Sequence, residues 1–368
     1  MRTKFNIVIV LGAGASYEAG APLMNGFFDK ARLLYSSQQL DKDVIVDFKR
    51  VFDAINALQS VHSKAFIDIY NLEAVFAAFE FAQLLQINET FNHDLIVSLK
   101  KLIAVTIEKS LKFKLTNAAY GLEPPAEYLE FVKLIKEWRQ LGCRVTVISF
   151  NYDIALDYAF LRVGIPINYC LNDYAPKADE LVFLKLHGSL HWNQCNVCQR
   201  IFAVDLSKSY THPSNLYPTK TLVEMGLRKI QIEHLGLDNK TTCAGQIDSV
   251  CYLVPPSWNK YSYYQTIAPI WRQAAKELKN ANSISVCGYS LPLTDQFFHN
   301  LYALGTMDGE PLHSFHVYNP DSSDVVQNRF KDLLGTGAVQ KFRYISGEPG
   351  RFSQSMQTIH YSLKALLR

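Results

Sequence analysis

The sequence has little charge, and neither sign dominates. Only 19% of the 368 residues are charged, and 37 basic residues nearly balance 34 acidic ones, for a formal net charge of +3. A basic tail or stripe that could follow a phosphate backbone is missing, so we expect no direct binding to nucleic acid. Because 48% of the residues are hydrophobic, a large core can be buried and wholesale disorder is excluded.

Long apolar runs are also missing. No stretch approaches the roughly 18 residues that a membrane-spanning helix requires. The apolar run over residues 5–11 follows Arg2 and Lys4, as in a secretory signal peptide. It is short, however, rich in β-branched residues and followed by glycines typical of a strand-to-helix turn. We therefore predict a strand at this position and a soluble protein without a membrane contact.

Cysteine is too scarce for a disulfide framework. The seven cysteines are an odd number in a chain long enough to fold without disulfides, so we expect the reducing cytoplasm. Cys195 and Cys198 form a Cys-x-x-Cys pair, which suits half of a structural zinc site because its turn directs both thiolates at one tetrahedral ion. The candidates for the other half are Cys243 and Cys251, with His212 or His234 as alternatives.

Short, β-branched apolar runs recur at wide intervals, with room for a helix between most of them. Buried parallel strands have this continuous apolar pattern, so the sequence predicts an α/β fold with a Rossmann-like parallel sheet. The predicted strands are residues 6–11, 144–149, 181–186, 252–254, 283–287, 315–318 and 339–344. Helical spacing of apolar residues predicts intervening helices such as 127–140.

Two stretches interrupt the alternation and are interpreted as insertions. Residues 25–115 lack a convincing strand and form a helical insertion, with predicted helices at 43–58, 72–86 and 94–112. Residues 194–250 are irregular and contain cysteines, and a loop of this length needs an organiser such as a metal. The Rossmann-like body then comprises residues 1–24 and 116–368.

Five of the predicted strands are followed by glycine or short polar residues, where open α/β sheets bind their ligands. These motifs are Gly12-Ala13-Gly14-Ala15-Ser16, Asn151-Tyr152-Asp153, His187-Gly188, Gly288-Tyr289-Ser290 and Asn319. Glycines let a backbone approach a pyrophosphate, and the imidazole of His187 suits a general base near neutral pH. Each motif has an ordinary alternative, such as a tight turn at Gly12 or a helix cap at Asn151. Together they predict one ligand crevice.

With Gly20-Ala21-Pro22 after the first motif, the order of these motifs resembles the sirtuin family over about residues 5 to 345. The segments Ser149-Phe150-Asn151-Tyr152-Asp153 and Gly288-Tyr289-Ser290-Leu291-Pro292 are most similar to bacterial sirtuin-like proteins of anti-phage defence. In that branch the fold hydrolyses NAD. The resemblance therefore implies a sirtuin-like body with NAD as its substrate.

The resemblance also implies a role for each position. It places Gly12, Ala13, Gly14 and Ser16 around the pyrophosphate, and adds Ala21 and Pro22 to the NAD-binding residues. Asp153 would hold the nicotinamide carboxamide, and Gly288, Ser290 and Asn319 would contact the adenosine half. The catalytic residues would be Asn151 and His187, which flank the reacting ribose.

Two departures favour an NAD glycohydrolase over an NAD-dependent protein lysine deacylase. Deacylating sirtuins typically continue from Gly-x-Pro with Asp-Phe-Arg, whereas this chain has Leu23-Met24-Asn25. They also carry Phe-Gly-Glu where a peptide adds as an extra strand, and this chain has Pro255-Pro256 in that region. Prolines cannot donate the hydrogen bonds of a β-ladder. A third alternative is a subunit that senses NAD or ADP-ribose without cleaving it.

Unrestrained NAD cleavage would kill the host, so the resemblance implies a regulated effector that depletes NAD in abortive infection. After about residue 345 we predict one further helix, 353–367, which leaves no room for a sensor domain. The expected trigger is a separate ATPase or a phage-derived activator protein. We also expect a homo-oligomer, because the helical insertion carries enough apolar surface to pack on a neighbour.

Overall fold

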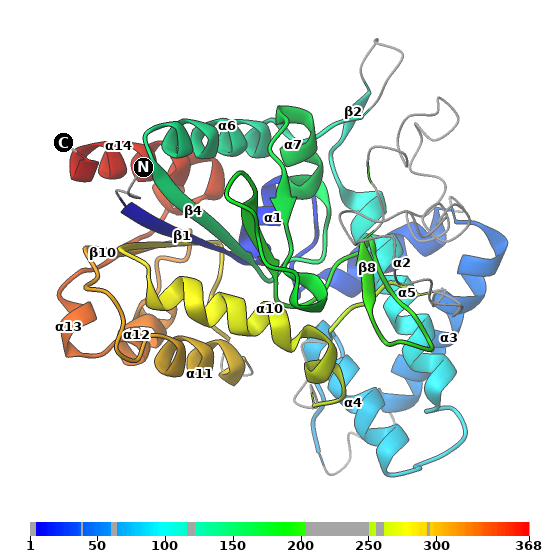
Figure 1. The fold of residues 1–368 in the computed structure, drawn as a ribbon. Coiled ribbons are helices and arrows are strands. Elements are labelled where there is room, and N and C mark those ends of the chain that lie inside the picture. The colour runs from blue at the N-terminus through cyan, green and yellow to red at the C-terminus, as the bar shows by residue number, and fades with distance from the viewer. Residues whose placement is uncertain are drawn as a thin grey trace.

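The computed structural model describes residues 5–37, 40–59, 65–115, 122–203, 206, 250–254, 261–292 and 295–367 (Figure 1). Its centre is a seven-stranded sheet in the order β11-β10-β9-β1-β4-β6-β5, and every neighbouring pair is parallel. The strands are β1 (Phe5–Leu11), β4 (Cys143–Ser149), β5 (Ile167–Asn168), β6 (Leu181–Lys185), β9 (Ser283–Cys287), β10 (Ser314–Tyr318) and β11 (Phe342–Ile345). The predicted α/β fold with a Rossmann-like sheet is confirmed.

Helices cover both faces of this sheet, which is why the central strands are apolar on both sides. Figure 1 shows α6 (Ala126–Gln140), α7 (Ala155–Val163) and α14 (Phe352–Leu367) over one face. The other face carries α10 (Tyr261–Lys279), α11 (Gln296–Gly305), α12 (Asp324–Leu333) and the short α13 (Thr336–Val339). Among the residues described, none of the helices combines the length and the hydropathy that crossing a bilayer requires.

The stretch that follows the first strand is helical, as predicted. After the short α1 (Ala13–Glu18) it contains α2 (Phe27–Ser36), α3 (Lys42–Gln59), α4 (Leu72–Leu84) and α5 (His93–Ser110), which we call the helical block. Two asparagines cap its helices: the side chain of Asn71 accepts hydrogen bonds at the start of α4, and that of Asn92 does so at the start of α5. The apolar core of the block also includes Tyr152 and Ile154. The block therefore packs against the segment that follows β4.

Three predictions about strands need correction. Residues 252–254 form no strand of the sheet, and only Leu253 makes an isolated antiparallel bridge, to Gly188. This segment instead bonds to the chain after β6, where the N–H of Val254 donates to the carbonyl of His187 over 2.8 Å. Residue 339 belongs to α13, so the last strand begins at Phe342.

The third correction concerns the boundaries of the two predicted insertions, at or beside which short strands lie. Antiparallel pairing joins β2 (Lys114–Leu115) to β3 (Leu122–Glu123), and β7 (Trp192–Gln194) to β8 (Ile201–Ala203). These strands are only two or three residues long, too short for a periodic pattern to reveal. The predicted domain boundaries stay predictions, and residues 207–249 lie outside the described residues.

Candidate functional site

The sheet has a reversal of strand order beside β1. From β1 the chain continues to β4 on one side, and later to β9 on the other side. In open α/β sheets such a switch point opens a crevice at the carboxyl ends of the strands. The two loops that flank it here begin at Gly12, after β1, and at Gly288, after β9. The topology therefore brings together two of the predicted glycine motifs.

These two loops contact each other through their backbones. The N–H of Gly14 donates to the carbonyl of Gly288 over 2.8 Å. A Cβ on Gly12 would lie 2.5 Å from the Cα of Tyr289, and a Cβ on Gly14 would lie 2.8 Å from the Cα of Gly288. Gly288 has a φ of +64°, and a Cβ there would collide with the backbone of Ala15. The contact thus requires glycine at all three positions.

The same contact uses backbone N–H groups of the loop that is predicted to bind the pyrophosphate of NAD. The N–H of Gly12 donates to the carbonyl of Cys287 over 3.0 Å, and the N–H of Ala15 donates to the carbonyl of Gly12 over 2.9 Å. A pyrophosphate that accepts from the N–H of Gly14 would have to replace the bond between Gly14 and Gly288. The predicted cradle residues Gly12 and Gly14 are therefore at the crevice, with their amides bonded within the protein.

Two asparagines reach the crevice from the neighbouring strand ends. The side-chain amide of Asn151, after β4, donates to the carbonyl of Gly12 over 2.9 Å. Asn319, after β10, donates to the carbonyl of Tyr289 over 3.3 Å and accepts from the N–H of Asp321. Both predicted residues thus bind the loops at the switch point, and both offer an amide that can exchange partners.

Ser16 and Asp153 meet beneath the first loop. The Ser16 hydroxyl donates to Asp153 Oδ2, and the hydroxyl of Tyr128 lies 3.1 Å from Ser16 Oγ. The other carboxylate oxygen of Asp153 accepts from the N–H of Ala155 over 3.0 Å. Burial of the Asp153 side chain raises its pKa, although nearby Lys185 and the bond from Ser16 oppose this shift. These side chains face each other in the interior, while their predicted contacts with NAD stay predictions.

His187 follows β6 and is 7% exposed. Its ring meets the ring of Phe150 edge-on at 5.0 Å between centroids. Its Nε2 lies 3.9 Å from a carboxylate oxygen of the buried Asp295. The same oxygen accepts a 2.6 Å hydrogen bond from the Tyr289 hydroxyl. A carboxylate beside the imidazole can orient the ring and stabilise its protonated form, as a general base requires.

Sequence reasoning assigned no role to Phe150, Tyr289 or Asp295. The rings of Phe150 and Tyr289 stack at 4.4 Å with an interplanar angle of 9°, and so close the space between the ends of β4 and β9. Burial, and then the neighbouring Asp295, raise the pKa of Tyr289 well above its usual value. For Phe150 and Tyr289, the only sequence signal is an aromatic residue one or two positions after a strand, and such residues are common in cores.

The remaining predicted NAD-binding residues differ in their surroundings. Ala13 and Pro22 are half-buried. Ala21 is buried in the core of the helical block, and its N–H donates to the carbonyl of Ser16. Ser290 is exposed, and its carbonyl accepts from Arg329 over 3.3 Å. Ala21 is therefore enclosed by packing, whereas Ser290 is accessible to a ligand, and the contacts of all four residues with NAD stay predictions.

The predicted zinc site is only partly within the described residues. Cys195 is buried and Cys198 is exposed, and the N–H of Gln199 donates to the Cys195 carbonyl in the turn between β7 and β8. Within the described part of the chain, no three His, Cys, Asp or Glu side chains gather as metal ligands would, so Cys251 does not complete a site with this pair. Burial raises the pKa of the Cys251 thiol to about 12. Because Cys243, His212 and His234 lie outside the described residues, zinc stays a prediction.

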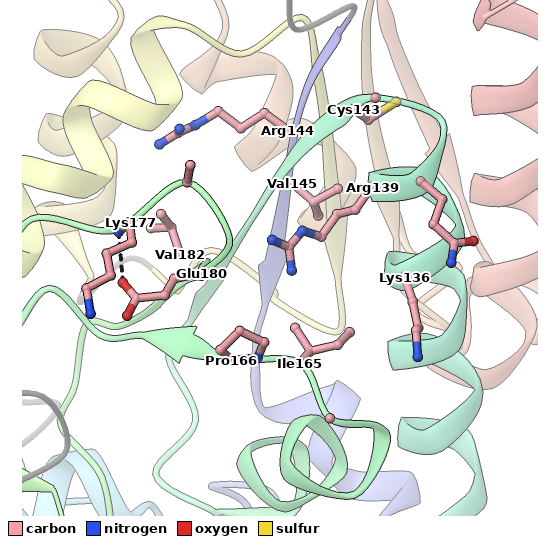
Figure 2. Close-up of a pocket in the computed structure, with 14 residues that line it drawn as sticks. Lys136, Arg139, Cys143, Arg144, Val145, Ile165, Pro166, Lys177, Glu180 and Val182 are labelled. Atoms are coloured by element: carbon pink, nitrogen blue, oxygen red, sulfur yellow. Dashed lines mark hydrogen bonds between the residues drawn. The ribbon is translucent and has the colours of Figure 1, made fainter. Parts of the chain in front are cut away.

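A pocket of about 590 Å³ lies at the opposite end of the strands. Figure 2 shows the residues that line it, from the last turn of α6, the start of β4 and the segments that lead into β5 and β6. The charged residues in the lining are Lys136, Arg139, Arg144, Lys177 and Glu180. Arg144 is bound by Glu277 through bonds of 2.6 and 3.1 Å. This pocket faces away from the switch point and contains none of the predicted site residues.

Comparisons with known proteins found similar solved structures only. No family model matches the chain, and no curated protein matches it. A Sir2 homolog in complex with NAD is 15% identical with a TM-score of 0.45, over 100% of this chain and 92% of that one. A Sir2 homologue mutant with ADP-ribose is 14% identical with a TM-score of 0.40, over 99% and 95% of the two chains. Sir2Tm bound to a propionylated peptide is 12% identical with a TM-score of 0.40, over 99% and 94%.

Proposed function

We propose that this chain is an NAD glycohydrolase that cleaves NAD to nicotinamide and ADP-ribose at the switch point of its sheet. The observation that carries the proposal is the meeting of the Gly12 and Gly288 loops there, with Asn151 and His187 at the adjacent strand ends. A dinucleotide needs close backbone approach at its pyrophosphate, and small glycine loops at a switch point allow it. The sirtuin-like order of motifs then selects NAD as the dinucleotide.

The chemistry fits the side chains at this edge. Cleavage of the nicotinamide–ribose bond develops positive charge on the ribose, so the site must orient the sugar and supply a polarised water. In the proposal, the amide of Asn151 exchanges its bond with Gly12 for one with a ribose hydroxyl or the water. His187, oriented by Asp295 at 3.9 Å, accepts the proton from that hydroxyl or water.

The direct test is to incubate the purified chain with NAD, alone and together with its activator, and to follow nicotinamide and ADP-ribose by chromatography. We expect Asn151→Ala and His187→Ala each to lower turnover at least a hundredfold, because proton transfer contributes about 10²–10⁴-fold and a misplaced reacting group can cost about 10²-fold. His93→Ala, on the exposed start of α5, is the matched control and should retain full turnover. Undiminished cleavage by either site variant, with folding intact, would contradict the assignment.

We further propose that the activity is regulated and serves anti-phage defence by depleting NAD. The support is the resemblance to that branch of the sirtuin-like proteins, together with amides that are already bonded within the protein at the Gly12 loop. In cells, NAD should fall after infection only when the chain and its separate activator are both present.

A purified chain that consumes NAD only when an acyl-lysine peptide is added, and forms O-acyl-ADP-ribose, would instead indicate a deacylase.

A further inference from the structure

Lys185, the last residue of β6, is buried at 1% exposure. A lysine is almost never buried to this extent unless its charge is paired. Its ammonium group lies 2.9 Å from a carboxylate oxygen of Asp157 in α7, which is also fully buried. An apolar residue would be the ordinary choice at a buried strand position, so the ion pair calls for a reason beyond packing.

Asp157 lies at the end of a chain of hydrogen bonds whose other members are uncharged side chains. Its second oxygen accepts from the Tyr169 hydroxyl over 2.7 Å, and His191 Nε2 lies 3.1 Å from the same hydroxyl. Burial lowers the pKa of His191 to about 4, so its ring is neutral at physiological pH. The neutral ring then donates from Nε2 to Tyr169 and accepts from Ser189 at Nδ1, which lies 3.0 Å from Ser189 Oγ. Lys185 is therefore the group that balances the charge of Asp157.

The ammonium group has a second partner on the segment that carries Asn151. Lys185 Nζ donates to the backbone carbonyl of Asp153 over 2.5 Å. One residue earlier, the carbonyl of Tyr152 accepts from the N–H of Leu190 over 3.0 Å. The segment 151–153 is thus held from below by the end of β6 and by the residues that follow it.

We propose that Lys185 is a positioning residue for the candidate NAD site, which fixes the Asn151–Asp153 segment by bonding the Asp153 carbonyl while pairing with Asp157. The inference rests on the proposed function and extends it. Lys185 lies beneath the crevice and acts through the backbone that aims Asn151. The groups proposed to bind the adenosine half follow β9 and β10, so their contacts do not depend on Lys185.

The test uses a charge-neutral double variant, Lys185→Met with Asp157→Asn. Lys185→Met alone would leave Asp157 as an unpaired buried charge and endanger folding. In the double variant the asparagine keeps an oxygen to accept from Tyr169, while the bond to the Asp153 carbonyl is lost. The matched control removes another lysine–aspartate pair, Lys101→Met with Asp47→Asn, whose 3.1 Å contact lies within the helical block.

We expect the Lys185 double variant to lower kcat for nicotinamide release at least tenfold and to change KM for NAD by a smaller factor, because alignment of the reacting ribose is lost while the adenosine contacts remain. Amide hydrogen exchange of a peptide covering residues 150–154 should quicken at least tenfold, with the melting curve still cooperative. The control pair should leave kcat and this exchange unchanged.

Wild-type values of kcat and of exchange at residues 150–154 in the folded double variant would overturn the proposal, since they would make the pair purely structural. The exchange measurement needs no turnover. A wild-type protein that releases no nicotinamide with any activator would contradict the proposed glycohydrolase, while the exchange rates would still decide whether Lys185 holds the segment.

Discussion

Gly288→Ala should separate the two loops at the switch point, and its cost can be worked out from the structure. The φ of +64° places the residue in the left-handed region, where a Cβ costs about 1–2 kcal/mol. The new Cβ also meets the backbone of Gly14 and Ala15, which cannot rotate away as a flexible side chain could. Overpacking of this kind costs about 1–3 kcal/mol. We therefore expect the free energy of unfolding to fall by about 2–5 kcal/mol.

A matched control isolates the steric part of this cost. Gly164→Ala changes a glycine with a φ of +73° at the end of α7, where a new Cβ meets no atom within 4 Å. It should lose only the backbone part, about 1–2 kcal/mol. Denaturant unfolding of both variants measures the difference, and calorimetry measures ADP-ribose binding, which Gly288→Ala should weaken at least tenfold and Gly164→Ala should not change. Equal losses of stability, or unchanged binding in Gly288→Ala, would refute the reasoning.

Two other predictions follow from the described contacts. Burial lowers the pKa of His191 from 6.5 to about 4, so between these pH values the folded protein binds fewer protons than the unfolded chain, and its stability falls as the pH falls. This group alone should lower the free energy of unfolding by about 2 kcal/mol between pH 6.5 and 5. In denaturant unfolding, the free energy of unfolding of His191→Gln should therefore depend less steeply on pH than that of the wild type. An unchanged pH dependence would contradict a neutral buried His191. Arg139→Met, in the pocket at the opposite end of the strands, should leave NAD turnover within twofold of wild type, and a larger loss would place that pocket in the reaction.

Part of the candidate site was predictable because it depends on local sequence and on one general property of parallel sheets. Gly12, Asn151, His187, Gly288 and Asn319 each follow an apolar run that is long enough to identify as a strand. The carboxyl ends of parallel strands share one edge, so the residues that follow them lie along that edge, and the strand order then decides which of them are neighbours. The helical block was predictable for a similar reason, since each of its helices has its own apolar periodicity.

Other parts depend on contacts between distant segments. The segment at 252–254 has the composition of a strand, yet its hydrogen bonds go to His187, Ser189 and Trp192. The approach of Asp295 to His187 joins residues 108 positions apart and leaves no mark in either local motif. The same is true of Ser16 and Asp153, whose hydrogen bond spans 137 positions. Partner choice at this range is decided by packing.

The sequence by itself determined the α/β class, most of the longer strands of the sheet, the helical block, and the presence of glycine and polar residues after strand ends, because these follow from periodicity and from chemistry within a few residues. It missed the two-residue strand β5 of the sheet. Only the tertiary structure decided that β1 lies between β4 and β9, that the Gly12 and Gly288 loops meet backbone to backbone, and that Lys185 is paired with Asp157 beneath Asn151. The physical reason is that a buried charge or a glycine contact is favourable only when its distant partner is in place, and local sequence contains no record of that partner.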